Sequence, residues 1–236
     1  MRRIFAGLTA LVLLVGLWLW PLWHGPGSEF GVFAPRDVAL RLRALPEPLR
    51  ITVLGTSLSH NEPWPDQLSE ALNACLGPTE ITVLAQPGAG VLWGQGQVGA
   101  VAEATPDLVL VEFAINDADI RDGLPRAEAA AETRALLAAL AEALPGAALV
   151  EMTMSPASGL RGVLRPGLAG YYEDVITRAV QGSHGAIDLY ARWLTLPRAE
   201  RGLIDGLHPD PQIAAEVTVA PVRDYIAATF GASDIC

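Results

Sequence analysis

The stretch that decides the fold is LRITVLGTSLS, residues 49–59, an apolar run that stops at a glycine, a threonine and two serines. Its first half is rich in β-branched and apolar residues, which is typical of a buried strand. The small hydroxyl residues that follow have two interpretations. They form either a turn that caps the next helix, or a turn that presents a serine nucleophile at the end of a strand.

Similar runs recur along the chain and alternate with helical stretches. The further strands are predicted at 81–85, 107–114, 147–154 and, more weakly, 185–190. The helices are predicted at 64–76, 92–104, 126–144, 168–181 and 212–230. This alternation indicates a parallel sheet that is covered on both faces. We therefore predict an α/β fold, a three-layer α/β/α sandwich with a parallel sheet of about five strands. In such folds the site lies at the carboxyl ends of the strands.

Composition and charge limit the partners. The chain has 236 residues, enough for one domain with a substantial core, and a net charge of −10. A nucleic-acid partner would need a basic surface, so none is expected. No Lys/Arg cluster follows Arg2 and Arg3, so charge does not direct the protein to an anionic membrane surface either. No cysteine–histidine spacing resembles a zinc site, and no metal or cofactor is expected.

The N-terminus predicts export. Arg2 and Arg3 precede an apolar stretch of 20 residues, 4–23, which is long enough to cross a bilayer as a helix. Tryptophans at its far end suit the membrane interface, and the arginines favour the cytoplasmic side. A cleaved signal peptide is the alternative, although its apolar core would usually be shorter. The expected organisation is a membrane anchor or signal segment at 1–24, a tether at 25–48 and the functional domain at 49–236. The domain would lie outside the cytoplasm, in the periplasm or the extracellular space, or be secreted after signal cleavage.

The cysteines and two tryptophans leave alternatives open. Cys75 and Cys236 would share an oxidising compartment in an exported protein. A bridge between them is possible, but the sequence does not establish that they are close. Trp64 and Trp93 stand near the first two loops at the predicted site edge. They either line a substrate groove or belong to the core.

Two motifs are rejected. GQGQVG at 94–99 fits G-x-G-x-x-G, but a dinucleotide fingerprint should follow its strand immediately, and here the strand ends near Ala85. A helix edge packed close to the sheet is the favoured interpretation. DADIRDG at 117–123 hints at a calcium loop, yet it lacks the glutamate that closes an EF-hand and the helix before it. A solvated turn is favoured there.

A serine nucleophile needs a histidine to take its proton and a third group to orient that histidine. Among the four histidines, His208 has the most suitable setting. In DGLHPD, residues 205–210, Asp205 stands three residues before His208, so that in a turn its carboxylate can reach one ring nitrogen. Pro209 biases His208 out of the helical region. A capping loop with a surface histidine is the alternative.

Two further stretches end at the same predicted edge, QPGAGVLWG at 86–94 and FAINDAD at 113–119. A tetrahedral oxyanion needs fixed donors, such as backbone N–H groups in glycine-rich turns or an asparagine amide. Gly90, Asn116 and the N–H of Ser57 are the candidates. A plain turn is the alternative for Asn116. Serine, glycine, asparagine and histidine with aspartate thus occur in chain order at one edge of the predicted sheet.

These four blocks resemble those of the SGNH hydrolases, also called the GDSL esterase/lipase family, over residues 49–230. The resemblance implies a flavodoxin-like sheet. It also implies Ser57 as nucleophile, Asp205 and His208 as the rest of the catalytic triad, and an oxyanion hole made by Ser57, Gly90 and Asn116.

Three positions depart from the family pattern. Thr56 stands where the family has an aspartate, and Ala114 where the third block usually begins with glycine. Gln86 is the residue nearest to the asparagine expected at the start of the second block. The register of that block also leaves Gly88 as an alternative donor to Gly90.

The resemblance implies a serine ester hydrolase that works through an acyl-enzyme. The predicted export makes an ester of an envelope or extracellular carbohydrate or lipid the expected substrate. Short acyl groups such as acetyl are expected, because no extended apolar lid segment separates the blocks. An O-acyltransferase with the same triad is the alternative, and a non-catalytic carbohydrate- or lipid-binding module is a distant one. The sequence does not indicate an oligomeric state.

Overall fold

The computed structural model describes residues 15–16, 34–40, 43–60 and 62–236. Within them, five parallel strands form one sheet in the order β2-β1-β3-β4-β5. The strands are β1 (Leu49–Gly55), β2 (Thr79–Ala85), β3 (Leu108–Val111), β4 (Ala148–Thr153) and β5 (Gly185–Asp188). The main helices are α3 (Trp64–Leu76), α4 (Val91–Gln95), α5 (Val98–Glu103), α7 (Arg126–Ala143), α9 (Leu168–Gln181), α10 (Leu189–Thr195) and α11 (Pro211–Thr229). The strand order is flavodoxin-like, and the predicted α/β/α sandwich is confirmed.

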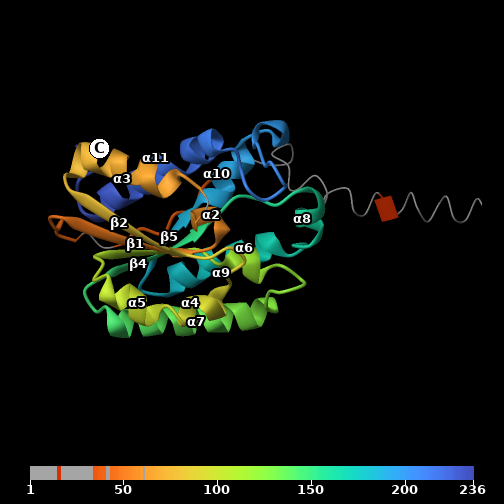
Figure 1. The fold of residues 1–236 in the computed structure, drawn as a ribbon, viewed down its shortest axis with the longest axis horizontal. Helices are drawn as coiled ribbons and strands as arrows, with labels where there is room; N and C mark the ends of the chain where they lie inside the picture. The colour runs from red at the N-terminus through yellow and green to blue at the C-terminus, as the bar shows by residue number, and fades with distance from the viewer. Residues whose placement is uncertain (1–14, 17–33, 41–42, 61) are drawn as a thin grey trace, which may run out of the picture.

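The sheet buries both faces because side chains alternate along each strand. Leu108 and Leu110 of β3 pack in the core beneath α3 and α11, whereas Val109 and Val111 pack against α4, α5 and α7. Figure 1 shows these two helix layers above and below the sheet. The continuous apolar runs of the sequence therefore form a core on each side of one sheet.

The element boundaries differ from the prediction where glycines and turns intervene. The helix predicted at 92–104 is two short helices, α4 and α5, and Gly96 ends the first of them. Gly94 packs so closely on the ring of Phe113 that an added Cβ would lie 2.5 Å from it. GQGQVG therefore serves close packing, as the favoured interpretation had it.

Two predicted strands end early because the chain turns into short helices. The strand predicted at 107–114 stops at Val111, and the one predicted at 185–190 stops at Asp188, whose carboxylate caps α10. Three short helices at the site edge were not predicted: α2 (Ser57–His60), α6 (Ala114–Asp117) and α8 (Gly159–Val163).

Contacts near both ends of the chain tie it to this framework. Cys75, near the end of α3, forms a disulfide with Cys236, the pairing that the sequence left open. Val38, in the predicted tether, forms an antiparallel bridge with Ala186 of β5. The predicted membrane segment falls outside the described residues, apart from residues 15–16. Among the residues that are described, no helix is long and apolar enough to span a bilayer.

Candidate active site

Ser57, His208 and Asp205 lie in one hydrogen-bonded chain. Ser57 is the first residue of α2, directly after β1, and is 6% exposed. His208 Nε2 lies 2.8 Å from Ser57 Oγ, and His208 Nδ1 lies 3.0 Å from Asp205 Oδ2. The structure thus brings together the three residues that the sequence analysis proposed as a triad. In this geometry the imidazole can accept the serine proton while the carboxylate orients the ring.

The loop that carries Asp205 keeps its carboxylate ionised. Asp205 Oδ1 accepts hydrogen bonds from the N–H groups of Leu207 and His208, at 3.0 and 2.8 Å. Burial opposes ionisation, but these two N–H groups and the imidazole together lower the pKa of Asp205 to about 2. Gly206 has a φ of 83° and its backbone lies against Ser158, so a glycine is required in this turn. The carboxylate is therefore charged at neutral pH and can stabilise an imidazolium.

Asn116 is held in one orientation by groups on both sides of its amide. Its Nδ2 donates to the carbonyl of Ala89 at 2.9 Å, and its Oδ1 accepts from Arg165 Nη2 at 3.3 Å. Arg165 is buried, donates to the carbonyl of Ile115 at 2.7 Å and pairs with Asp119 at 3.0 Å. An amide nitrogen carries two hydrogens, so one remains for an oxyanion. The sequence interpretation missed Arg165, because no local pattern links it to Asn116.

Gly90 lies against a buried carboxyl group. Asp117 Oδ1 accepts from the N–H of Val91 at 2.9 Å, and a Cβ on Gly90 would come within 2.5 Å of the same oxygen. Burial raises the pKa of Asp117 to about 6, although the Val91 N–H and Arg178 lower it. Gly88, the alternative donor, has a φ of 78°. A side chain at Gly90 would clash with Asp117, and a side chain at Gly88 would be strained by its positive φ.

Glu112 is a buried carboxyl group beneath the serine turn, and the sequence interpretation missed it. Its Oε1 accepts from the Thr56 N–H at 2.6 Å and from Ser59 Oγ at 2.7 Å, and its Oε2 accepts from Thr56 Oγ1 at 3.0 Å. Burial raises the pKa of Glu112 to about 7 against these hydrogen bonds. Thr56 therefore donates to a carboxyl group that an aspartate at its position would repel. The sequence signal that could have revealed Glu112 is an acidic residue within the apolar run DLVLVEFA, residues 107–114.

A cavity of about 310 Å³ opens beside the triad. Its lining includes Ser57, His208, Gly90 and Asn116, so the proposed nucleophile, base and donors face one space. The volume lies at the lower end of the range for small-molecule sites, about 300–1,000 Å³.

The two tryptophans have different roles. Trp93 lines the cavity beside the triad. Trp64 is 1% exposed and donates its Nε1–H to the carbonyl of Leu58 at 2.7 Å. Trp93 therefore belongs to the site and Trp64 to the core.

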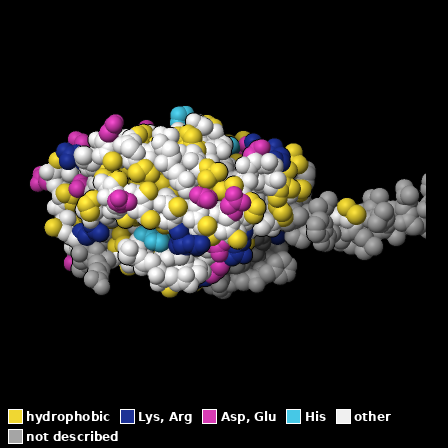
Figure 2. Space-filling view, turned by 90° about the horizontal axis from the view of Figure 1, so that it is seen from below, with side chains coloured by type: hydrophobic (Ala, Val, Ile, Leu, Met, Phe, Trp, Pro, Cys, Tyr) yellow, Lys and Arg dark blue, Asp and Glu magenta, His cyan; other side chains and the backbone are white. Residues whose placement is uncertain are grey.

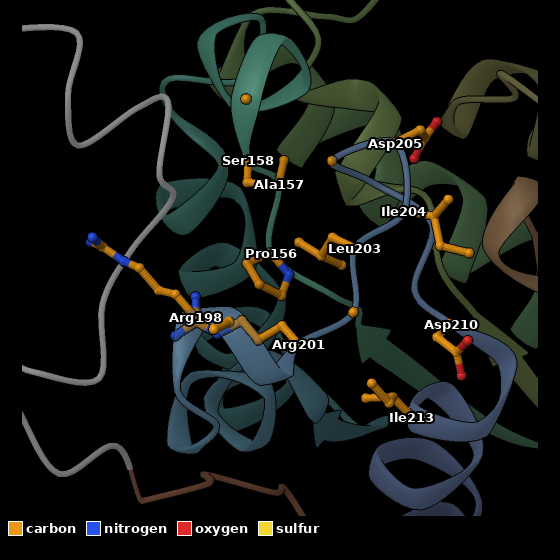
Figure 3. Close-up of a pocket in the computed structure, with 14 residues that line it drawn as sticks. Pro156, Ala157, Ser158, Arg198, Arg201, Leu203, Ile204, Asp205, Asp210 and Ile213 are labelled. Atoms are coloured by element: carbon orange, nitrogen blue, oxygen red, sulfur yellow. The ribbon is translucent and has the colours of Figure 1, made fainter.

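A larger cavity, of about 910 Å³, lies on the other side of the Asp205 loop. Figure 3 shows Leu203 pointing toward Pro156, whereas the side chains of Ile204 and Asp205 point away from the segment that contains Ser158. The lining of this cavity does not include Ser57 or His208 among the described residues. The larger of the two cavities is therefore not the one that contains the proposed catalytic residues. In the described part of the chain, no group of three or more His, Cys, Asp or Glu residues is placed to hold a metal ion.

A parallel α/β sheet with a Ser–His–Asp chain at its carboxyl edge defines a class, the α/β proteins with serine-hydrolase geometry. The model of the GDSL-like Lipase/Acylhydrolase family matches residues 51–215. The chain therefore belongs to the GDSL-like lipase/acylhydrolase family, and at this general level it is an ester hydrolase. The family resemblance read from the sequence is confirmed.

Several solved structures share the fold of this chain. A lipase/acylhydrolase from Enterococcus faecalis has a TM-score of 0.65 and 20% identity, covering 76% of this chain and 96% of its own. A GDSL-like lipase from Bacteroides thetaiotaomicron has a TM-score of 0.63 and 14% identity, covering 79% and 92%. A carbohydrate acetylesterase family member from Sinorhizobium meliloti has a TM-score of 0.61 and 15% identity, covering 78% and 99%. At these identities the likeness concerns the fold. No match was found among curated protein sequences.

Proposed function

We propose that this protein hydrolyses short-chain acyl esters, such as acetyl esters, of an envelope or extracellular carbohydrate or lipid. The observation that carries the proposal is the hydrogen-bonded chain from Ser57 Oγ through His208 to Asp205 beside a cavity of about 310 Å³. An intact chain of this kind has no purpose in a binding module, so a catalytic role is favoured over a non-catalytic one.

The proposed mechanism uses the residues as the structure arranges them. Ser57 Oγ attacks the ester carbonyl while His208 Nε2 takes its proton, and Asp205 stabilises the resulting imidazolium. The oxyanion is bound by the N–H groups of Ser57 and Gly90 and by the Asn116 amide. His208 then gives its proton to the leaving alcohol. Water, deprotonated by the same histidine, hydrolyses the acyl-enzyme and restores Ser57.

The proposed substrate class has two supports. The small cavity favours a short acyl group. The S. meliloti structure with the same fold is described as a carbohydrate acetylesterase family member, which makes an acetylated carbohydrate a reasonable substrate to test first.

We also propose that the domain works outside the cytoplasm, attached to a membrane through residues 4–23 or secreted. The apolar stretch in the sequence supports attachment or export. The Cys75–Cys236 disulfide supports the location, because such bonds persist in oxidising compartments.

The test compares the full chain with Ser57→Ala and with a matched control, Ser183→Ala, at an exposed serine outside the site. Hydrolysis of p-nitrophenyl acetate is followed, and labelling by a fluorophosphonate probe is mapped by mass spectrometry. We expect hydrolysis and a label on Ser57 in the wild type and in Ser183→Ala. The Ser57→Ala variant should lose at least a thousandfold in kcat.

Other outcomes would redirect the proposal. A label on Ser57 without hydrolysis, with turnover restored by an added alcohol acceptor, would identify an O-acyltransferase instead. A folded wild type with neither label nor turnover would contradict the catalytic proposal. A preference for long acyl chains in a series of p-nitrophenyl esters would contradict the proposed chain length.

A further inference from the structure

The described chain enters the domain at the edge that carries the triad. Ala34 lies in a small cavity with Asp188, the last residue of β5, and the N–H of Arg36 donates to the Asp188 carboxylate at 3.1 Å. Val38 then pairs antiparallel with Ala186. The chain therefore arrives at the carboxyl ends of the strands and runs back toward their amino ends. Ser57 follows β1 at the same edge.

Four exposed apolar side chains belong to segments at this edge, and we call them the apolar rim. They are Leu92, Ile120, Leu160 and Ile204, with exposed fractions of 52%, 68%, 64% and 74%. Leu92 lines the cavity beside the triad. Each of the other three directly precedes a residue of the site region, namely Arg121, Arg161 and Asp205.

The rim residues come from separate segments of the chain, two of which are joined by a hydrogen bond. The N–H of Ile120 donates to the carbonyl of Leu164, which follows α8, and Leu160 lies on α8 itself. Figure 3 shows Ile204 next to Asp205. Figure 2 shows hydrophobic side chains at the right-hand end of the body, the end at which α8 lies in Figure 1. Single exposed apolar residues need no explanation, but several exposed apolar residues at one edge of the molecule mark a surface for an apolar partner.

The charges at this edge do not favour binding by electrostatics. Arg121 pairs with Asp119 at 2.8 Å, and Arg161 lies 3.4 Å from the Asp205 carboxylate. The whole chain has a net charge of −10. Contact with a partner at this edge would therefore depend on the apolar side chains.

The apolar stretch that precedes the domain in the sequence indicates that the apolar partner of this edge is a membrane. Ten residues, 24–33, separate the apolar stretch 4–23 from Ala34. Ten residues reach at most about 35 Å when extended. If residues 4–23 span a membrane, the edge where Ala34 lies stays within that distance of the bilayer.

We propose that the active-site edge docks on the bilayer through the apolar rim, so that the cavity opens toward esters held at the membrane surface. The proposal rests on the membrane attachment and ester hydrolysis proposed above. A lipid surface fits this edge better than a tightly bound protein, which would close the cavity entrance.

The first test measures depth at single labelled positions in the full chain. Both cysteines of the protein are joined in the disulfide, so an introduced cysteine carries a unique thiol. Ile120→Cys and Leu160→Cys report on the rim. Val180→Cys is the matched control, because Val180 is 69% exposed near the end of α9, whose following strand, β5, starts at the opposite edge of the sheet.

Each variant is labelled with an environment-sensitive fluorophore and reconstituted in phosphatidylcholine vesicles that contain a doxyl-labelled lipid quencher. We expect severalfold stronger quenching at the two rim positions than at the control, with or without added phosphatidylglycerol. Equal quenching at all three positions would overturn the proposal. Rim quenching that requires phosphatidylglycerol would also overturn it, in favour of docking by charge.

The second test separates docking from catalysis. The double variant Ile120→Ser/Leu160→Ser should hydrolyse a water-soluble acetyl ester at the wild-type rate, and an ester embedded in vesicles severalfold more slowly. Val180→Ser should match the wild type on both. Equal rates of the double variant and the wild type on both esters would overturn docking. A wild type inactive on both esters would instead contradict the hydrolase, while the quenching result would still decide the orientation.

Discussion

Glu112 and Glu151 are both buried in the same sheet region, yet their carboxylates are held in opposite ways. Glu112 accepts hydrogen bonds from neutral groups, the backbone and hydroxyl of Thr56 and the hydroxyl of Ser59. Glu151, in β4, pairs with Arg178 of α9, whose Nε and Nη2 lie 2.9 and 2.7 Å from its Oε2. The two residues are 1% and 2% exposed, so burial does not distinguish them.

The difference lies in what each carboxylate organises. Glu151 joins β4 to α9 through its ion pair with Arg178. Glu112 joins the residues on either side of Ser57, and its donors carry no charge. We infer that Glu151 mainly stabilises the fold, whereas Glu112 mainly shapes the turn that positions the nucleophile.

The largest effect is expected from Glu151→Ala. Arg178, 10% exposed, would remain buried without its carboxylate. Breaking a buried pair in this way costs about 3–5 kcal/mol, so the free energy of unfolding in urea should fall by that amount. The kcat of the folded variant should be unchanged. The double variant Glu151→Met/Arg178→Met should recover most of the loss, and an unchanged stability in the single variant would contradict a structural role for the pair.

The second effect is a pH dependence that Glu112→Gln should reduce. In the folded protein burial raises the pKa of Glu112 from 4.5 to about 7, so folding favours the protonated carboxyl. Its contribution to stability is complete below pH 4.5 and is lost as the pH rises through 7, by on the order of 3 kcal/mol. The pKa of Asp117 is raised to about 6, so this residue also lowers the stability as the pH rises, in the wild type and in Glu112→Gln alike.

The measurement is the free energy of unfolding from pH 4 to 8, for the wild type and for Glu112→Gln. The wild-type curve should fall more steeply between about pH 4.5 and 7. Parallel curves would show that Glu112 does not titrate in this range.

A smaller effect is expected from Gly55→Ala, which places a methyl group against the Glu112 carboxylate. Overpacking of this kind costs about 1–3 kcal/mol, and the displaced turn should lower kcat more than it changes KM. Gly99→Ala is the control, because an added Cβ there meets open space. Equal kcat values for the two variants would argue against tight coupling between Glu112 and the serine turn.

The smallest effect is expected from Thr56→Val, which removes the hydroxyl that donates to Glu112. The loss should be about 1 kcal/mol, with a lower kcat. Thr52→Val is the matched control on β1, the strand that leads into Thr56. Thr52 Oγ1 is buried and has no hydrogen-bond partner in the described part of the chain, so its removal should be neutral or stabilising. If both variants behave alike, the hydroxyl of Thr56 has no special role.

The same contrast explains how much could be predicted from sequence. The strands were predictable because their apolar runs are local, and DGLHP was predictable because Asp205 and His208 are three residues apart. The roles of Arg165 and Glu112 were not predictable, because each forms its hydrogen bonds with a segment about fifty residues away in the chain. The split of the predicted helix at 92–104 escaped for another reason. Gly96 ends α4 and Gln97 is the N-cap of α5, a local break that helical periodicity does not report.

The Cys75–Cys236 bond gives the covalent structure a topology of its own. Residues 75–236 form a closed ring that contains Asn116, Asp205 and His208, while Ser57 lies on the open arm that leads into it. A single proteolytic cut within the ring leaves the pieces linked, and they separate only after reduction. A cut between Ser57 and Cys75 detaches the serine from the ring, and only packing then keeps the two parts of the site together.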